Sequence, residues 1–255
     1  MRRALLVLIV PLFWASALAV AEEQVFEKSF SMEGVSRISV ENVNGEIDAK
    51  AWDRPYLKVR AVKNARGGGS AEALRLTEIR VVKKGEEILI ETVSPRRRRL
   101  FGFLDFGSHN VRVDYEIWAP ASAETHLETC NGRVEAAGFS NTLACDSVNG
   151  SIEIREATGP VKATTVNGSL RLGFQGTLKR THLETVNGSV EVIFDKGSSI
   201  EYDLETINGR IDGDPGIGLT VEGKYGPKEA KGSYNGGAES LYCETGNGSI
   251  RLKTN

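Results

Sequence analysis

The side chains best suited to catalysis or metal binding are three histidines, and their spacing argues against a metal centre. His126 and His182 each stand five residues before an Asn-Gly pair, whereas His109 lies outside that pattern. In a stack of repeats, three strand spacings would separate the first two imidazoles by roughly 14 Å. One ion cannot bind both across that distance. The chain also has no zinc motif, nucleophile elbow or phosphate-binding loop, so we predict no enzyme activity, no metal and no cofactor.

A carboxylate recurs three residues before most of the Asn-Gly pairs. Alternation along a strand points this position outward, away from the apolar residue before it. Two interpretations stay open: stacked carboxylates bridged by a cation such as calcium, or a solvated face balanced by nearby lysines and arginines. We favour the second, because the Gly-Gly-x-Gly-x-Asp repeats of calcium-binding stacks are absent. With Thr164 as the exception, the position is filled by Glu41, Glu128, Asp146, Glu184, Glu205 and Glu244.

The three cysteines occupy positions of the same pattern. Cys145 and Cys243 stand where other copies have Leu, and Cys130 stands directly before Asn, where other copies have Val. A free Cys behaves as a small buried hydrophobe, so we expect all three in the core. A Cys130–Cys145 disulfide between adjacent repeats is the alternative, because an exported chain meets an oxidising environment.

Four consecutive arginines precede a cluster of large apolar residues, and this segment is a candidate docking loop. The arginines would be attracted to an anionic membrane or envelope polymer, and the aromatic rings would anchor the contact. Alternatively, the aromatic residues cap one end of a repeat stack and leave the arginines solvated; we favour this interpretation. The residues concerned are Arg96, Arg97, Arg98, Arg99, Phe101 and Phe103.

A ten-residue repeat centred on Asn-Gly must position the recurring carboxylates, the three cysteines and the strands that carry His126 and His182. Seven copies occur, from VENVNGEIDA to CETGNGSIRL, with separations of 18, 18, 20, 21 and 39 residues from the second copy onward. The last separation predicts a degenerate copy in between. We expect the Asn-Gly pairs to be chain corners with positive φ angles. The predicted corners are Asn44-Gly45, Asn131-Gly132, Asn149-Gly150, Asn167-Gly168, Asn187-Gly188, Asn208-Gly209 and Asn247-Gly248.

Apolar and polar residues alternate on both sides of each corner, which indicates two half-buried strands per copy. Asn-Gly is a common hairpin turn, so an antiparallel meander is one possible architecture. The other is a β-solenoid, in which equivalent strands of successive repeats stack in parallel. The fixed period favours the solenoid. We therefore predict an all-β, parallel β-helix-like stack of about 18–21-residue repeats.

The N-terminal half is less regular but belongs to the same predicted domain. Ser70 is a candidate N-cap for a short helix that begins near Ala71. Strands are expected around 79–82, 88–93 and 111–118. Because no linker divides the chain, we predict one domain over 22–255, with an irregular part at 22–120 and regular repeats at 121–255.

The first 21 residues read as a secretory signal peptide. A cationic start precedes an apolar run, and Ala17, Ala19 and Ala21 give the A-x-A spacing of a cleavage site. We predict cleavage after Ala19 or Ala21, no transmembrane helix in the mature chain, and a location in the periplasm or at the cell surface. An uncleaved anchor is the alternative. With 32 basic and 34 acidic residues, nothing indicates a nucleic-acid partner.

The signal peptide, the early segment VNGEIDAKAW and the later TVNGS repeats together resemble the bacterial "putative adhesin" family of envelope β-strand-repeat proteins, a domain of unknown function. The resemblance covers nearly the whole mature chain. It implies a repetitive β fold, an extracytoplasmic role and no catalytic residues. We therefore expect a binding, adhesion-like or scaffold module whose partner is an envelope protein, a polysaccharide or an anionic surface. The alternative is a carbohydrate-active enzyme built on a β-solenoid.

Overall fold

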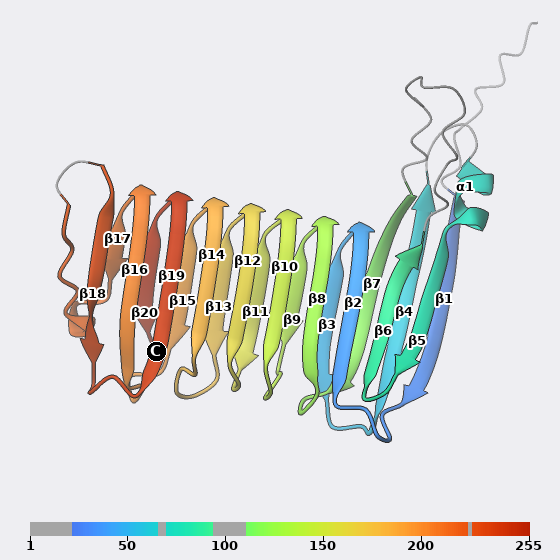
Figure 1. Cartoon of the computed structure of the whole chain (residues 1–255), viewed down its shortest axis with the longest axis horizontal. Coiled ribbons are helices and arrows are strands. Elements are labelled where there is room, and N and C mark those ends of the chain that lie inside the picture. The colour runs from blue at the N-terminus through green and yellow to red at the C-terminus, as the bar shows by residue number, and fades with distance from the viewer. Residues whose placement is uncertain (1–21, 66–69, 94–110, 224–225) are drawn as a thin grey trace, which may run out of the picture.

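The chain folds into two long β-sheets that share one apolar core (Figure 1). The structure is a computed structural model and describes residues 22–65, 70–93, 111–223 and 226–255. These residues form twenty strands, one α-helix, α1 (Ser70–Leu76), and one 3-10 turn, η1 (Pro215–Ile217). The predicted all-β class is confirmed, and so is the short helix, which begins at Ser70, one residue before the expected start near Ala71.

Each sheet contains ten strands, and we call the two sheets A and B. In spatial order, sheet A consists of β1 (Glu22–Ser31), β4 (Tyr56–Ala65), β7 (Val111–Pro120), β3 (Ile47–Trp52), β9 (Val134–Ala137), β11 (Ile152–Ala157), β13 (Leu170–Phe174), β15 (Val190–Phe194), β20 (Ile250–Thr254) and β17 (Ile211–Gly213). Sheet B consists of β18 (Lys228–Tyr234), β16 (Ile200–Asn208), β19 (Glu239–Asn247), β14 (Thr181–Asn187), β12 (Val161–Asn167), β10 (Leu143–Asn149), β8 (Glu124–Asn131), β2 (Arg37–Asn44), β6 (Glu87–Val93) and β5 (Glu78–Lys84).

The two strands that flank an Asn-Gly pair lie in different sheets, because the chain crosses from sheet B to sheet A at the corner. We call such a strand pair with its corner a rung. Each strand pairs in parallel and in register with the equivalent strand of the neighbouring rung, as Asn149 does with Asn131 and Ile152 with Val134. The corners are therefore not hairpin turns, and the meander alternative is excluded.

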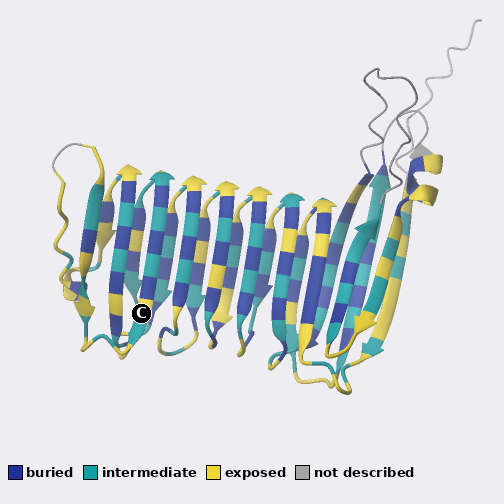
Figure 2. Cartoon of the chain, in the orientation of Figure 1, coloured by how far each residue is buried: buried dark blue, intermediate teal, exposed yellow. Residues whose placement is uncertain are grey.

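The predicted alternation of buried and exposed residues is confirmed (Figure 2). The position four residues before Asn faces the core in every rung, so the apolar side chains of neighbouring strands stack on one another. These buried residues are Val40, Leu127, Cys145, Ala163, Leu183, Leu204 and Cys243.

The corner glycines are required by close packing between rungs, and the predicted role of positive φ is wrong for most of them. Of the seven, Gly45 alone has a positive φ, 128°. At Gly168, an added Cβ would overlap the carbonyl oxygen of Gly150 and lie 2.5 Å from its carbonyl carbon. The same clash, with Gly168 as the neighbour, would arise at Gly188. Glycine is thus needed because the backbones of successive corners touch.

The N-terminal end contains one rung that lacks an Asn-Gly corner. β6 pairs in parallel with β2, and β7 pairs in parallel with β3. No Asn-Gly pair occurs in the sequence between β6 and β7. At this end three pairings are antiparallel: β1 with β4, β4 with β7, and β5 with β6. The strand direction therefore changes where the stack ends.

The C-terminal rung is out of chain order, and here the sequence prediction fails. β19 lies between β14 and β16, with Asn247 opposite Asn187 on one side and Asn208 on the other (Figure 1). The expected degenerate copy between the last two Asn-Gly pairs is not a rung. Instead, η1 is followed by β18, which pairs antiparallel with β16 and forms the last strand of sheet B. No helix in the described ranges is long and apolar enough to span a membrane.

Candidate functional site

The predicted corner asparagines form one hydrogen-bonded ladder along the stack. An Asn side chain has both a donor and an acceptor, so it can repeat the same bond from rung to rung. From Asn131 onward, each Nδ2 donates to the Oδ1 of the preceding Asn in the ladder at 2.8–2.9 Å. In spatial order the ladder is Asn44, Asn131, Asn149, Asn167, Asn187, Asn247 and Asn208.

A row of buried hydroxyl groups, which the sequence analysis missed, supports the ladder from inside. The residue two before Asn is Thr or Ser in six rungs, and its hydroxyl donates to the carbonyl oxygen of the neighbouring corner glycine at 2.7–3.2 Å. The Thr or Ser that recurs at this position in six of the seven copies was the available signal. Each bond gives a corner carbonyl group a hydrogen-bond partner from the neighbouring rung. The residues are Thr129, Ser147, Thr165, Thr185, Thr245 and Thr206.

The outer face of sheet A is covered by opposite charges in contact. Arg133, directly before β9, and Arg155 of the neighbouring β11 each contact both Glu135 and Glu153. This pattern neutralises the face locally and leaves little net field for a charged partner. Further ion pairs of this sheet are Lys58–Glu27, Arg60–Glu116, Arg112–Glu46, Arg171–Glu191 and Lys253–Glu191.

The outer face of sheet B has the opposite character, because carboxylates stack on carboxylates. The predicted outward position is confirmed, and β6 and β18, which flank the rungs with Asn-Gly corners, extend it. The strand register places these side chains directly opposite one another, with Thr164 as the single interruption. We call this set the acidic row. In spatial order it consists of Glu91, Glu41, Glu128, Asp146, Glu184, Glu244, Glu205 and Glu229.

Few cations balance the acidic row. Arg80 contacts Glu91, and Lys231 contacts Glu205 and Glu229. Among the described residues, no Lys or Arg side chain lies within salt-bridge distance of the other five carboxylates of the row. Unit charges 4 Å apart repel by about 1 kcal/mol even in water. The fold therefore holds a line of like charges against their mutual repulsion.

A second row of side chains runs beside the acidic row, one position before Asn. Five of its members are large apolar residues whose exposed fractions are 40–53%. We call this set the apolar row. In spatial order it consists of Val43, Cys130, Val148, Val166, Val186, Gly246 and Ile207. An exposed line of this kind is typical of an interaction surface.

The cysteine prediction is corrected by this row. Cys145 and Cys243 are buried as expected, and burial raises the pKa of both thiols. Cys130, in contrast, stands at the outward position of the apolar row and is half-buried. Because Cys130 points outward and Cys145 inward, the two do not form a bridge, and all three cysteines are free.

The two histidines of the repeat lie on the outer face of sheet B but do not form a common site. His126 Nε2 lies 2.9 Å from Asp146 Oδ2, and this hydrogen bond raises the pKa of His126. His182 Nε2 lies 2.8 Å from Glu184 Oε1, and its ring stacks on Tyr242. The strands of the two histidines, β8 and β14, are separated by β10 and β12. Each imidazole thus serves a separate carboxylate.

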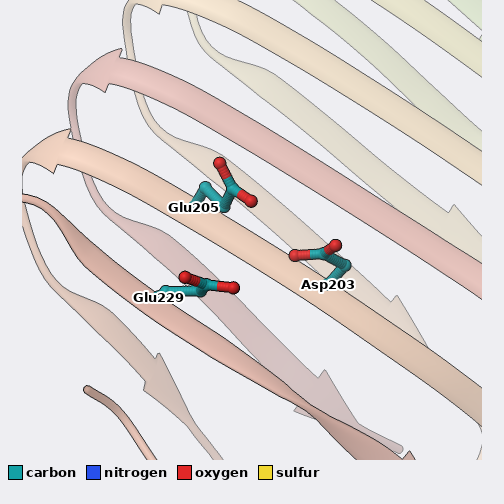
Figure 3. A group of neighbouring side chains, drawn as sticks. All are labelled: Asp203, Glu205 and Glu229. Carbon is teal, nitrogen blue, oxygen red and sulfur yellow. The ribbon is translucent and has the colours of Figure 1, made fainter.

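Three carboxylates at the C-terminal end of sheet B come close enough together to hold a metal. Asp203, Glu205 and Glu229 offer oxygen atoms within 4.8 Å of one another (Figure 3). Lys231 contacts all three, with Nζ 3.4 Å from Asp203 and 3.7 Å from Glu205, and the hydrogen bond to Glu229 raises the pKa of Lys231. The ammonium group already supplies the positive charge that an ion would bring, so we read the cluster as an ion-pair network.

The remaining predicted residues lie outside the described ranges. They are the signal peptide, residues 1–21, His109, and the docking candidates Arg96, Arg97, Arg98, Arg99, Phe101 and Phe103. The signal peptide and the docking loop stay predictions.

Residues 28–253 match the family model described as Toastrack DUF4097. No curated protein matches the sequence. A crystal structure of a putative cell adhesion protein from Clostridium sporogenes has a TM-score of 0.52 and 14% identity; the match covers 92% of this chain and 100% of that one. A putative adhesin from Bacteroides fragilis has a TM-score of 0.43 and 12% identity, covering 90% and 97%. At 14% identity, the match to the Clostridium sporogenes structure shows that the two chains share a fold.

Proposed function

Because the chain belongs to the Toastrack DUF4097 family, over residues 28–253, we propose that it is a non-catalytic binding module whose binding surface is the outer face of sheet B. The family match also confirms the resemblance stated from the sequence. We take residues 22–255 as one β-solenoid domain, in which the Asn-Gly corners are structural elements. The parallel, in-register pairing of successive rungs supports that architecture.

The observation that carries the proposal is the contrast between the two outer faces. On sheet A, charged side chains satisfy one another across neighbouring strands. On sheet B, the acidic row and the apolar row run side by side over at least seven strands. Repulsion and exposed apolar area both disfavour the free surface, and both are relieved when a complementary partner covers it.

We further propose that the module acts outside the cytoplasm, as the signal-peptide pattern of residues 1–21 predicts. A partner in the envelope, either a protein or a polymer, is then the natural choice. The alternative function, a carbohydrate-active enzyme, would require a pair of carboxylates with room for a sugar between them. Lys231 fills that space in the one acidic cluster described above, so we favour the binding module.

The test is co-sedimentation of the purified mature protein with cell-envelope fractions of the source bacterium. We expect the triple variant E128Q/E184Q/E244Q, which neutralises three carboxylates of the acidic row, to sediment less than the parent. The matched control is E33Q/D53N/D195N, which removes three loop charges away from this face. Equal sedimentation of both variants, at unchanged melting temperatures, would contradict the assignment of the binding surface.

A further inference from the structure

We propose that the partner of the sheet B face is a cationic polypeptide segment that carries apolar side chains beside its Lys and Arg residues. This inference rests on the proposed function, because it names the partner class for the same face. It also excludes, for this face, the anionic surface considered from the sequence, because an anionic partner would be repelled by the acidic row.

The charge of the partner follows from the acidic row. Its eight carboxylates and the interrupting Thr164 occupy nine neighbouring strands in register. With eight spacings of about 4.8 Å, the row is roughly 38 Å long. At 0.1 M salt the Debye length is about 10 Å, so each carboxylate is repelled by about two neighbours on either side. A line of cationic groups relieves all of these repulsions at once, whereas a single ion relieves few. The row therefore fits an extended cationic chain.

The apolar character of the partner follows from the second row. The apolar row stands two residues further along each strand than the acidic row, which is about 6.6 Å. A partner that lies along the stack touches both rows at once. Simple polycations would leave Val148, Val166 and Val186 uncovered, and these side chains are 40–49% exposed. Apolar side chains on the partner would remove that area from water.

The C-terminal end of the face offers a place for one anchoring side chain. A hollow of about 300 Å³ lies where β16, β18 and β19 meet, with four carboxylates and Ile207 in its lining. Lys228 is the cation of this lining, and its Nζ donates to the carbonyl oxygen of Gly209 at 2.6 Å. A Lys or Arg side chain of the partner would meet carboxylates on several sides. The four carboxylates are Glu205, Glu222, Glu229 and Glu244.

The length of the segment follows from the apolar row, whose seven positions span roughly 29 Å at 4.8 Å per strand. An extended chain advances about 3.3 Å per residue, so about nine residues cover the row. In an extended chain, alternate side chains point to opposite sides. A segment in which basic and apolar residues alternate can therefore direct its cations to one row and its apolar groups to the other.

The probes that test this inference are three labelled peptides. Each has about twelve residues, because an extended chain of that length, at about 3.3 Å per residue, spans the roughly 38 Å of the acidic row. One alternates Lys with Val, one Lys with Ser and one Glu with Val. We expect the Lys-Val peptide to bind the mature protein with an affinity that falls as salt rises, the Lys-Ser peptide to bind at least about tenfold more weakly, and the Glu-Val peptide not to bind. Fluorescence anisotropy measures all three.

Two triple variants assign the binding to the rows. E128Q/E184Q/E244Q and V148S/V166S/V186S should each weaken the Lys-Val peptide by about tenfold or more, while E33Q/D53N/D195N should leave it unchanged. Circular dichroism checks that every variant is folded. Equal binding of the Lys-Val and Lys-Ser peptides, or no effect of either row variant, would overturn the inference.

Two further outcomes separate this inference from the proposed function. If the acidic-row variant loses envelope sedimentation but the Lys-Val peptide does not bind the parent, the partner class is wrong and the binding face stands. If the protein self-associates at low salt, and changing Arg96, Arg97, Arg98 and Arg99 to Gln abolishes this, then the occupant is a second copy of the chain. That result would overturn the inference of a separate partner.

Discussion

Replacing Gly168 with Ala is expected to destabilise the protein strongly, although the change adds a single methyl group to a surface corner. The new Cβ would lie 2.5 Å from the carbonyl carbon of Gly150 and closer still to the oxygen. Carbon atoms pack favourably at about 3.5–4.0 Å. The two rungs must therefore move apart by about 1 Å at this corner, because the obstacle is backbone and not the end of a flexible side chain.

The cost can be worked out from the bonds that such a movement stretches. Between these two rungs the corner holds the Gly150 N to Asn167 O bond at 3.1 Å, the Thr165 Oγ1 to Gly150 O bond at 2.9 Å, and the Asn167 to Asn149 side-chain bond at 2.8 Å. At about 1 kcal/mol each, their loss amounts to about 3 kcal/mol, a large share of the 5–15 kcal/mol typical of a domain.

Urea unfolding, followed by circular dichroism, measures the effect, and Gly173→Ala is the matched control. Gly173 lies in the same rung, has no positive φ, and its added Cβ would meet nothing nearer than the Ile154 carbonyl oxygen at 3.9 Å. We expect Gly173→Ala to be neutral or slightly stabilising, because Gly weakens a strand interior. If the two variants differed by less than about 1 kcal/mol, the close-packing argument would be refuted.

Three other predictions concern buried hydroxyls, pH and export. Thr185→Val should cost about 1–2 kcal/mol in the same assay, because the Gly168 carbonyl loses its 2.9 Å hydroxyl donor; a neutral result would count against the hydroxyl row. The raised pKa of His126 means that its bond to Asp146 stabilises the fold below about pH 6.5 and fades as pH rises through the folded-state pKa. An NMR titration should show this pKa above 6.5 and lowered in Asp146→Asn; an unchanged pKa in the variant contradicts the assignment. N-terminal sequencing of the exported protein should begin at Val20 or Glu22, and an intact residue 1 or 2 would indicate an anchor.

The sequence allowed the all-β class, the alternation and the corner positions to be predicted, because each rung repeats the same pattern of side chains. The residue four before Asn is buried in every rung, as period-two alternation required. The reason for glycine was mistaken, because both a positive φ and a close backbone approach select Gly, and only coordinates separate them. Cys130 was misplaced because a small apolar residue before Asn looks like a core residue, although alternation sends it outward.

The order of the rungs could not be read from the chain. The sequence of a single repeat does not show whether its rung follows the preceding rung in space or inserts between two others. Asn247, for example, makes the same kind of side-chain bond to Asn187 and to Asn208 as the other corner asparagines make to their neighbours. The rung formed by β6 and β7 was also not recognised, because no Asn-Gly pair lies between these two strands in the sequence. The acidic row was found in outline, but its extension to Glu91 and Glu229 depends on pairings at the two ends of the sheet.

The measurement that most directly tests the sheet B face as the binding surface is site-specific photo-crosslinking in intact cells. A photoreactive residue replaces Val166, at the centre of the apolar row, or Arg171, on the sheet A side of the same rung. We predict a discrete crosslinked product from position 166 that disappears when E128Q/E184Q/E244Q is added, and no such product from position 171. Products of equal yield from both positions, or a product at 166 that persists in the acidic-row variant, would contradict the proposal.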